Sequence, residues 1–585
     1  MNKFFETSWN FRRLLVLLMF GCGFLLLVLR AMQLQVLKHD FYREQGLARQ
    51  QRVVEIAAHR GNILDRHGEP LAVSTPIDSV WAVPEEAVED MDAVARVGEA
   101  LGLETESLLA KVQTASDQGR EFVYIKRHVT PGVAEQVKAT DAPGVALMRE
   151  YRRYYPSGSA ATHIIGFTNI DDVGQEGMEM AFDQWLRGKP GKRKVVRDLK
   201  GREIEGVDIL DSAIAGKDLH LSIDKQLQYF AERSLANAVE KHQATSGSVI
   251  VLDVNTGEVM AMVNHPSYNP NNKLSRKGDD GRQRNRAITD VFEPGSTMKP
   301  FTIAAALESG QFRPEDIVFT SPGAYKIGKY EVRDEADYGW LDLRGIIRKS
   351  SNVGVSKVAT QLEPNQLWGM FDRLGFGRPT GSAFPGEVAG YFNHPTLWHH
   401  VEQATLSYGY GISVSALQLV RAYAAIANGG MLPQISFVKN KESVQSERVL
   451  DEDTALELHQ MLESVVSEDG TGRRANVPGY RIAGKTGTSH RSQGGGYAED
   501  RYISLFAGFA PVSEPRFAAV VVVHDPQEEG HFGGVVAAPV FAEVMSSALR
   551  LGGIEPDNLA DAEMRSLAMP QRSSESLAPI TEDAW

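Results

Sequence analysis

Three short polar strings in the second half of the chain constrain its fold, because they form one reactive site only if the fold brings them together. They are Ser296-Thr-Met-Lys299, Ser350-Ser-Asn352 and Lys485-Thr-Gly-Thr488. Together they supply a serine nucleophile, two lysines that can set its protonation, and an amide and hydroxyls that can orient a peptide. S-x-x-K also occurs at Ser222–Lys225 and Ser436–Lys439, so the prediction depends on the ordered set and not on one string.

A proline locates the first string at the start of a helix. Pro300 is tolerated only in the first turn, where its missing N–H would have no partner. A helix therefore begins close to Ser296 and continues through residues 303–307. This places Ser296 at the positive helix end, with Lys299 on the same face and within reach of its hydroxyl. Lys299 can serve as a base if burial and a second cation, for which Lys485 is the candidate, lower its pKa.

Composition excludes several other classes of protein. The chain has 585 residues, 42% of them hydrophobic and 23% charged, which predicts three or four folded units. A net charge of −13 argues against a nucleic-acid partner. The single cysteine, Cys22, excludes an internal disulfide and a cysteine-cluster metal site. The adjacent His399 and His400 have no obvious acidic partner, so we predict neither a metal nor a cofactor.

An uncharged segment near the N-terminus indicates membrane attachment. Residues 14–29 carry no charge and lie between Arg12-Arg13 and Arg30, giving about 24 Å of helix. Snorkelling of Arg30 can extend the span to residue 32. We predict an uncleaved signal anchor at 14–32 after a cytoplasmic tail at 1–13; a cleaved signal peptide is the alternative. The flanking charges give almost no orientation signal.

The remaining chain is predicted to contain helices and strands in separate stretches. Residues 33–55 have the pattern of an amphipathic helix that continues from the membrane, and residues 85–140 that of a helical subdomain. We expect strands at 218–224, 247–254, 258–263, 504–510 and 517–524, with Asp224 capping a helix that starts at Lys225. Strands flanking a helical middle indicate an α+β domain with an antiparallel sheet beside helices. The tail, 556–585, has a disordered composition.

Three further stretches lie before the catalytic strings: residues 58–72, 149–156 and 174–179. The first is also explained as two short strands joined by a turn at Arg66-His-Gly68. With the three strings, these stretches resemble class B penicillin-binding proteins, and among them the division-specific type. The resemblance implies a non-catalytic pedestal domain at 33–215 and a serine β-lactamase-like transpeptidase domain at 216–555.

The resemblance also implies roles for individual residues. Ser296 is the nucleophile, Lys299 the general base and Ser350 the proton relay, while Asn352 and Lys485 complete the catalytic set. The backbone N–H groups of Ser296 and Thr488 form the oxyanion hole. The expected substrate-binding residues are Thr486, Gly487 and Thr488 on one strand, with Tyr410, Tyr502 and Phe532 as aromatic candidates. Gly487 is expected to let the substrate backbone approach the strand without a Cβ clash.

The implied activity is D,D-transpeptidation of septal peptidoglycan through a serine acyl-enzyme that β-lactams block. The enzyme would sit in the bacterial inner membrane with its bulk in the periplasm. It would act on D-Ala-D-Ala stem peptides and an acceptor amine, beside a membrane glycan polymerase and other division proteins. The alternatives are an elongation-specific transpeptidase, a serine β-lactamase, and a β-lactam sensor or scaffold. Residues 479–486 also fit a phosphate-binding loop literally, but no strand-loop-helix unit follows them.

Overall fold

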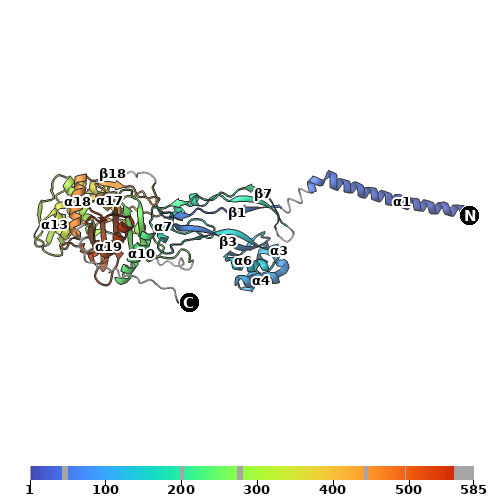
Figure 1. The fold of residues 1–585 in the computed structure, drawn as a ribbon, viewed down its shortest axis with the longest axis horizontal. Coiled ribbons are helices and arrows are strands. Elements are labelled where there is room, and N and C mark those ends of the chain that lie inside the picture. Colours follow the sequence, from blue (N-terminus) through green and yellow to red (C-terminus); the bar gives the residue numbers. More distant parts are fainter. Residues whose placement is uncertain are drawn as a thin grey trace, which may run out of the picture. The chain divides into compact units, whose positions relative to one another are not determined.

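The computed structural model describes residues 2–42, 51–197, 203–272, 281–440, 446–493 and 496–558. The chain divides into two compact units (Figure 1). Unit 1 comprises residues 1–60, 74–152 and 187–216, and unit 2 comprises 61–73, 153–186 and 217–585. Each unit is therefore assembled from segments that are distant in the sequence.

Unit 1 contains a long N-terminal helix, a three-stranded antiparallel sheet (β1-β6-β7) and a helical layer beside strands β3, β4 and β5. Its core lies among the helices and these last strands, around Val80, Val94, Val97, Val112 and Ile125. The predicted helical subdomain is confirmed, with the added strand β4 within it. The bounds are α1 Asn2–Met32, η1 Gln33–Leu37, β1 Gln51–Ile56, β3 Pro70–Ala82, α3 Pro84–Ala87, η2 Val88–Asp90, α4 Met91–Leu101, α5 Thr105–Asp117, β4 Val123–Val129, α6 Pro131–Ala139, β5 Val145–Tyr154, β6 Gly191–Arg197 and β7 Glu203–Asp211.

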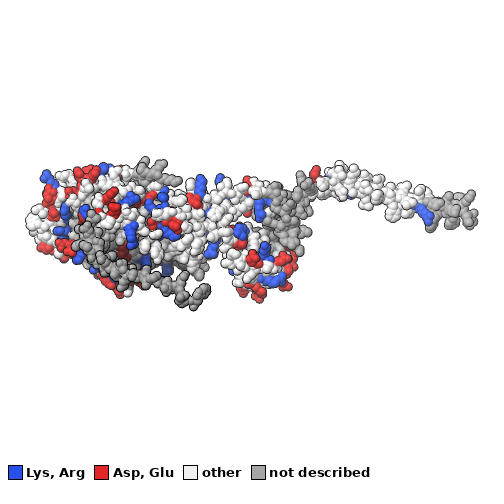
Figure 2. All heavy atoms as spheres, in the orientation of Figure 1, with Lys and Arg blue, Asp and Glu red and all other residues white. Residues whose placement is uncertain are grey.

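Helix α1 is long and apolar enough to cross a membrane. The candidate span is Arg13–Leu37, with a mean hydropathy of 2.5 and none of it buried inside the protein. Figure 2 shows an almost uncharged surface along the middle of this helix. A second apolar helix, α19 (Gly533–Leu551), meets the same criterion but is 56% buried and packs in the core of unit 2. The length and composition of α1 are therefore consistent with a single membrane anchor.

The predicted amphipathic helix at 33–55 is wrong over its last part. The helix changes to a π-helical turn at Gln33–Leu37, and residues 43–50 lie outside the described part of the chain. Gln51–Ile56 then forms strand β1, which pairs antiparallel with β6 from Ile56↔Gly191 to Gln51↔Val196. Hydrogen bonding to a distant segment therefore overrides the local helical pattern.

Unit 2 is built on a five-stranded antiparallel sheet in the order β10-β9-β21-β20-β19. Helices α10 and α19 pack on one face, and α17 packs on the other (Figure 1). The expected strand-turn-strand and the final strand pair are confirmed, and Asp224 caps α10 by accepting from the N–H groups of Gln226 and Leu227. The sheet consists of β9 Ser246–Asp253, β10 Val259–His265, β19 Ala483–Gln493, β20 Gly496–Ala510 and β21 Phe517–His524.

The other elements of unit 2 surround this sheet or connect its strands. The expected strand at 218–224 is shorter, because after Leu221 the chain leaves β2 and hydrogen-bonds to other segments. The bounds are β2 Ile63–Leu64, α7 Thr162–Ile165, α8 Gly177–Ala181, α9 Asp183–Leu186, β8 Leu219–His220, α10 Lys225–Lys241, α11 Arg286–Thr289, η3 Gly295–Met298, α12 Lys299–Glu308, β11 Ile317–Phe319, β12 Ala324–Ile327, β13 Tyr330–Arg333, β14 Trp340–Asp342, α13 Leu343–Lys349, α14 Asn352–Ala359, α15 Pro364–Arg373, β15 Tyr391–Phe392, η4 Pro395–Leu397, α16 His400–Leu406, β16 Ile412–Ser413, α17 Ala416–Ala427, β17 Met431–Pro433, β18 Ser446–Arg448, α18 Glu452–Val466, η5 Arg473–Ala475 and α19 Gly533–Leu551.

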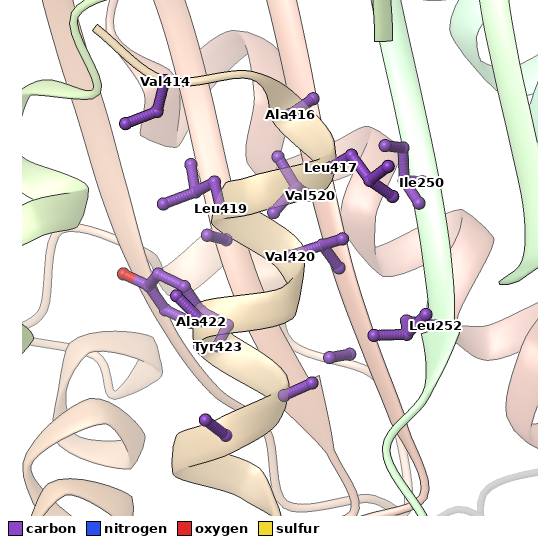
Figure 3. Close-up of a cluster of buried hydrophobic side chains, with 14 of the residues drawn as sticks. Ile250, Leu252, Val414, Ala416, Leu417, Leu419, Val420, Ala422, Tyr423 and Val520 are labelled. Carbon is purple, nitrogen blue, oxygen red and sulfur yellow. The ribbon is translucent and has the colours of Figure 1, made fainter. Parts of the chain in front are cut away.

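The sheet is buried on both faces because successive residues of its central strands enter different cores. Ile250 and Leu252 of β9 face α17, where Leu417 and Val420 pack against them (Figure 3). Val251, which lies between them in the strand, belongs to the other core with α10 and α19. Side chains alternate between the faces of a strand, so a continuous apolar strand supplies both cores. Strand β19 lies at one edge of this sheet, paired with β20, and contacts the turn at Gly295–Met298.

The stretches resembling the family's non-catalytic motifs contribute to unit 2. Ile63–Leu64 and Pro70–Ala72 pair as two short strands around the predicted turn. Arg153 donates to the Glu179 carboxylate at 2.6 Å and to the Gly61 carbonyl at 2.8 Å, joining all three stretches. Both side chains of the ion pair are almost fully buried. Removing either partner would leave an unpaired buried charge, so the pair requires these segments to assemble together.

Candidate active site

The nucleophile string lies at a helix start, as its proline predicts. Residues Gly295–Met298 form a 3₁₀ turn, and α12 begins at Lys299 with Pro300 in its first turn. Ser296 is half-buried, whereas Lys299 is fully buried. The Lys299 Nζ lies 2.9 Å from the Ser296 Oγ. The nucleophile is therefore within hydrogen-bonding distance of its candidate base.

The second string closes around the same lysine. The Lys299 Nζ lies 2.5 Å from the Ser350 carbonyl oxygen, 3.1 Å from the Ser350 Oγ and 2.7 Å from the Asn352 Oδ1. Ser350 itself has a left-handed backbone, with φ of 60°. This conformation turns both its carbonyl and its hydroxyl towards Lys299. The Asn352 side-chain oxygen thus contacts the same amine as Ser350 does.

The two serines of the second string have different structural roles. Ser350 is the C-cap of helix α13, although it stands only two residues before the start of α14. Ser351 is the N-cap of α14, and its hydroxyl accepts a hydrogen bond from the Gly354 N–H. The capping task falls to Ser351, which leaves the Ser350 hydroxyl available to the site.

The third string brings the second lysine to the other side of Ser350. The Lys485 Nζ donates to the Ser350 Oγ at 2.9 Å and to the Thr486 carbonyl at 3.1 Å. Ser350 Oγ therefore lies between the two amines, each within hydrogen-bonding distance. Lys485 is fully buried in strand β19, so the lysine of the literal phosphate-loop match lies on a strand and not in a loop.

Burial decides the protonation of both lysines. Burial lowers the pKa of Lys299 to about 7, against the opposing charges of Asp334 and Glu335. Burial also lowers the pKa of Lys485 well below its usual range, and the positive charge of Lys299 adds to this effect. The two amines contact the same hydroxyl and are shielded from solvent, so a positive charge on one disfavours protonation of the other. One of the pair can therefore be neutral near neutral pH.

The hydrogen-bond geometry is suited to a neutral Lys299. A neutral amine has two N–H donors and one lone pair. The two donors fit the Ser350 carbonyl and the Asn352 Oδ1, which are the two shortest contacts. The lone pair then accepts the hydroxyl proton of Ser296. The arrangement can thus remove the proton from the nucleophile as it attacks.

Strand β19 lies at the edge of the sheet and passes against the nucleophile turn. A Cβ on Gly487 would lie 2.9 Å from the Thr297 Cγ2 and 3.0 Å from the Pro294 carbonyl oxygen. The absent side chain therefore accommodates the turn, whereas the sequence suggested room for a substrate. This close packing holds the backbone of Thr488 beside that of Ser296. It supports the oxyanion-hole prediction, which stays a prediction.

A cleft of about 450 Å³ opens in front of these groups. Of the predicted residues, Ser296, Ser350, Asn352, Thr486, Gly487, Thr488, Tyr410 and Phe532 line it. Lys299 and Lys485 lie buried beneath, which suits amines that move protons. Thr488 Oγ1 accepts from the Gly533 N–H at 3.1 Å, and Thr486 Oγ1 lies 2.7 Å from Thr471 Oγ1. Both hydroxyls are thereby held in place.

Tyr502 is not among the residues that line the cleft. Its ring stacks on His531 with 3.7 Å between ring centroids, and His531 in turn lies against Phe532. Tyr502 therefore reaches the cleft only through these neighbouring rings. Tyr410 packs against Tyr408, which also lines the cleft and was not among the predicted substrate-binding residues.

Asp334 is a functional residue that sequence reasoning missed. Its Oδ1 accepts the backbone N–H groups of Asn352 at 2.5 Å and Val353 at 2.9 Å, and its Oδ2 accepts the Ser351 hydroxyl at 2.6 Å. It thus anchors the start of α14, from which Asn352 reaches Lys299. No sequence signal marks it, because Asp334 follows strand β13 and belongs to none of the three strings.

Among the described residues, no group of three or more His, Cys, Asp or Glu side chains could hold a metal ion. The chemistry derived above uses only the hydroxyl and amine groups of this chain.

Comparison with known proteins agrees with this geometry. Residues 247–546 match the protein-family model described as "Penicillin binding protein transpeptidase domain". Residues 55–221 match a second family model, described as "Penicillin-binding Protein dimerisation domain". The fold and the two matches together define a class B penicillin-binding protein, and the chain belongs to that family.

Individual relatives place it more narrowly. The peptidoglycan D,D-transpeptidase FtsI of Escherichia coli K12 is 43% identical over 96% of this chain and 95% of its own length. A probable peptidoglycan D,D-transpeptidase, PbpC of Pseudomonas aeruginosa, is 40% identical over 94% of this chain and 97% of its own length. The solved penicillin-binding protein 3 of Mycobacterium tuberculosis, in complex with aztreonam, is 26% identical. It superposes with a TM-score of 0.67 over 86% of this chain and 98% of its own.

Proposed function

We propose that this protein is an FtsI-type peptidoglycan D,D-transpeptidase that cross-links septal cell wall. The observation that carries the proposal is the chain of contacts from Ser296 through Lys299 and Ser350 to Lys485. This chain connects a nucleophile, a base and a second amine without a histidine. Similarity to FtsI over nearly the whole chain supports the substrate class.

The reaction has two steps. Ser296 Oγ attacks the penultimate D-Ala carbonyl of a stem peptide, and Lys299 takes the hydroxyl proton. The backbone N–H groups of Ser296 and Thr488 stabilise the tetrahedral oxyanion. Ser350, between the two lysines, passes a proton to the leaving nitrogen, and D-Ala departs. The amine of a second stem peptide then attacks the ester, releases Ser296 and forms the cross-link.

The cleft also explains binding of the donor peptide. Thr486 and Thr488, with Lys485 beneath them, bind the terminal carboxylate of D-Ala-D-Ala. The free edge of β19 pairs with the peptide backbone. A β-lactam presents a similar carboxylate and carbonyl, so it acylates Ser296 and leaves slowly. Tyr410 and Phe532 form apolar walls for the ligand.

The membrane anchor and the division role complete the proposal. Helix α1 would hold the enzyme in the inner membrane as a single span, with the rest of unit 1 and all of unit 2 in the periplasm. Since neither matched description covers glycan polymerisation, a membrane-embedded polymerase and other division proteins would supply the strands. Localisation of a fluorescent fusion to the septum separates this role from cell elongation.

Two measurements test the activity. Purified protein is incubated with a peptide ending in D-Ala-D-Ala and an acceptor amine, and the cross-linked product and released D-Ala are quantified. Ser296→Ala should abolish both products, and it should fail to complement loss of the gene. Complementation by Ser296→Ala would favour a sensor or scaffold instead. Rapid turnover of penicillin would favour a serine β-lactamase.

A further inference from the structure

Three positively charged side chains line the active-site cleft. Lys349, at the end of α13, and Arg473 and Arg474, in η5, all line the cleft that contains Ser296. The protein as a whole has a net charge of −13. A local excess of cations in an acidic protein focuses an attractive field on an anionic ligand.

The segment that carries the two arginines is firmly held. The Gly472 N–H donates to the Val465 carbonyl of α18 at 2.8 Å, and Ala475 is fully buried. Thr471, just before the arginines, is hydrogen-bonded through its hydroxyl to Thr486 of β19 at 2.7 Å. The arginines are thereby tied to the strand that carries Lys485. The fold therefore fixes the backbone of these two residues relative to Lys485.

Negative charges of the protein neutralise these three cations only weakly. Arg473 lies 3.9 Å from Glu468, and the two side chains are 68% and 91% exposed, so this pair contributes little. Lys349 donates to a carbonyl, that of Asp469 at 3.1 Å. In the described part of the chain, no salt bridge holds Arg474, although its charge helps to lower the pKa of Glu529. Glu335 lies on the same cleft, where its charge raises the pKa values of the buried Lys299 and Lys485.

We propose that Lys349, Arg473 and Arg474 bind a second carboxylate of the donor peptide, carried by a residue that precedes D-Ala-D-Ala. This inference rests on the proposed function, which assigns the terminal carboxylate to Thr486 and Thr488. The guanidinium groups suit a carboxylate because they can donate two parallel hydrogen bonds to it. The enzyme thus selects donors with an acidic residue upstream over donors in which that group is amidated.

The test compares two synthetic peptides that end in D-Ala-D-Ala and differ only in one upstream side chain, a carboxylate or its carboxamide. The full-length protein in detergent should release D-Ala from the carboxylate peptide with a kcat/KM about fivefold to tenfold higher. The double variant R473Q/R474Q should lose this preference by losing rate on the carboxylate peptide alone. Arg550→Gln removes a charge at the exposed end of α19, outside the cleft, and should keep the preference.

Each alternative outcome has a defined meaning. Equal rates of the unmodified enzyme on both peptides would overturn the inference. An equal loss on both peptides in R473Q/R474Q would also overturn it, because it would indicate a structural effect. Acylation of Ser296 by penicillin is measured in parallel. Absence of acylation in the unmodified enzyme would refute the proposed function itself, whereas normal acylation with no peptide preference refutes only the carboxylate subsite.

Discussion

The carboxylate of Asp334 and the hydroxyl of Ser351 form a 2.6 Å hydrogen bond across 17 residues of sequence. The same carboxylate binds two backbone N–H groups at the start of α14. A negative charge is favourable at a helix N-terminus. This carboxylate therefore fixes the loop from which Ser350 and Asn352 reach the buried lysine.

Replacing this carboxylate should impair catalysis more than stability. Asp334→Asn keeps the shape of the side chain but replaces one of its two acceptor oxygens with an NH2 group. That donor would face either the backbone N–H groups at the start of α14 or the Ser351 hydroxyl. We expect penicillin acylation to slow by about tenfold to a hundredfold. Loss of the charge that raises the pKa of Lys299 should also move the pH profile to lower pH. Stopped-flow acylation rates measured across pH check both effects.

A matched variant separates positioning from general helix capping. Asp342 caps the neighbouring helix α13, and its Oδ1 accepts the Gly345 N–H at 2.6 Å. Asp342→Asn should lower the free energy of unfolding by a similar amount. It should leave the midpoint of the acylation pH profile unchanged. A shift of the midpoint in Asp342→Asn, or its absence in Asp334→Asn, would contradict the role of Asp334.

Acylation should depend on pH through Lys299. Because burial lowers its pKa to about 7, the amine is protonated at lower pH and cannot accept the Ser296 proton. The rate should therefore rise with pH, with a midpoint near 7, and fall about tenfold for each unit below it. Lys299→Arg stays protonated and should lose at least about a hundredfold. Near-normal acylation by that variant would mean that Lys299 only positions the serine.

Penicillin should acylate Ser296 and no other S-x-x-K serine. The Ser222 side chain is buried and donates to the Val259 carbonyl at 2.7 Å. Ser436 donates to the Val438 carbonyl at 2.7 Å. In the described part of the chain, no lysine amine is hydrogen-bonded to either hydroxyl. Peptide mapping by mass spectrometry locates the adduct, and Ser436→Ala should label as fully as the unmodified protein.

The glycine of the third string should be intolerant of a methyl group. Gly487→Ala would push Cβ against Thr297 and the Pro294 carbonyl, displacing the nucleophile turn from β19. We expect acylation to fall at least about tenfold, since small misplacements of reacting groups are costly. Gly496→Ala, on the next strand β20, places its Cβ in open space and serves as control. Unchanged acylation by Gly487→Ala would contradict the packing argument.

The N-terminal helix should act as an anchor. Because the candidate span Arg13–Leu37 is apolar and unburied, full-length protein should stay in the membrane after carbonate washing. A version beginning near Gln50 should be released yet still bind penicillin, because unit 2 has its own cores. This version without the anchor should nevertheless fail to support septation. Detecting a mature N-terminus beyond Ala31 would instead identify a signal peptide.

Local chemistry alone determined several features. Pro300 located the helix start at the nucleophile, Asp224 marked a helix cap, and the apolar runs at 247–254 and 517–524 specified strands. These predictions succeeded because caps, prolines and periodicity act over a few neighbouring residues. The three strings likewise identified the residues that meet at the site.

Other features depended on contacts between distant segments, which local patterns do not encode. Residues 51–56 form a strand because β6 supplies their hydrogen-bond partners, and the first described residues of the predicted disordered tail, 556–558, are tied down by Asp557 and Asn558. Ser350 faces two lysines because Ser351 takes the capping role. The sequence by itself determined which groups do the chemistry. The tertiary structure decided their spacing, burial and pKa, since these arise only where separate segments pack together.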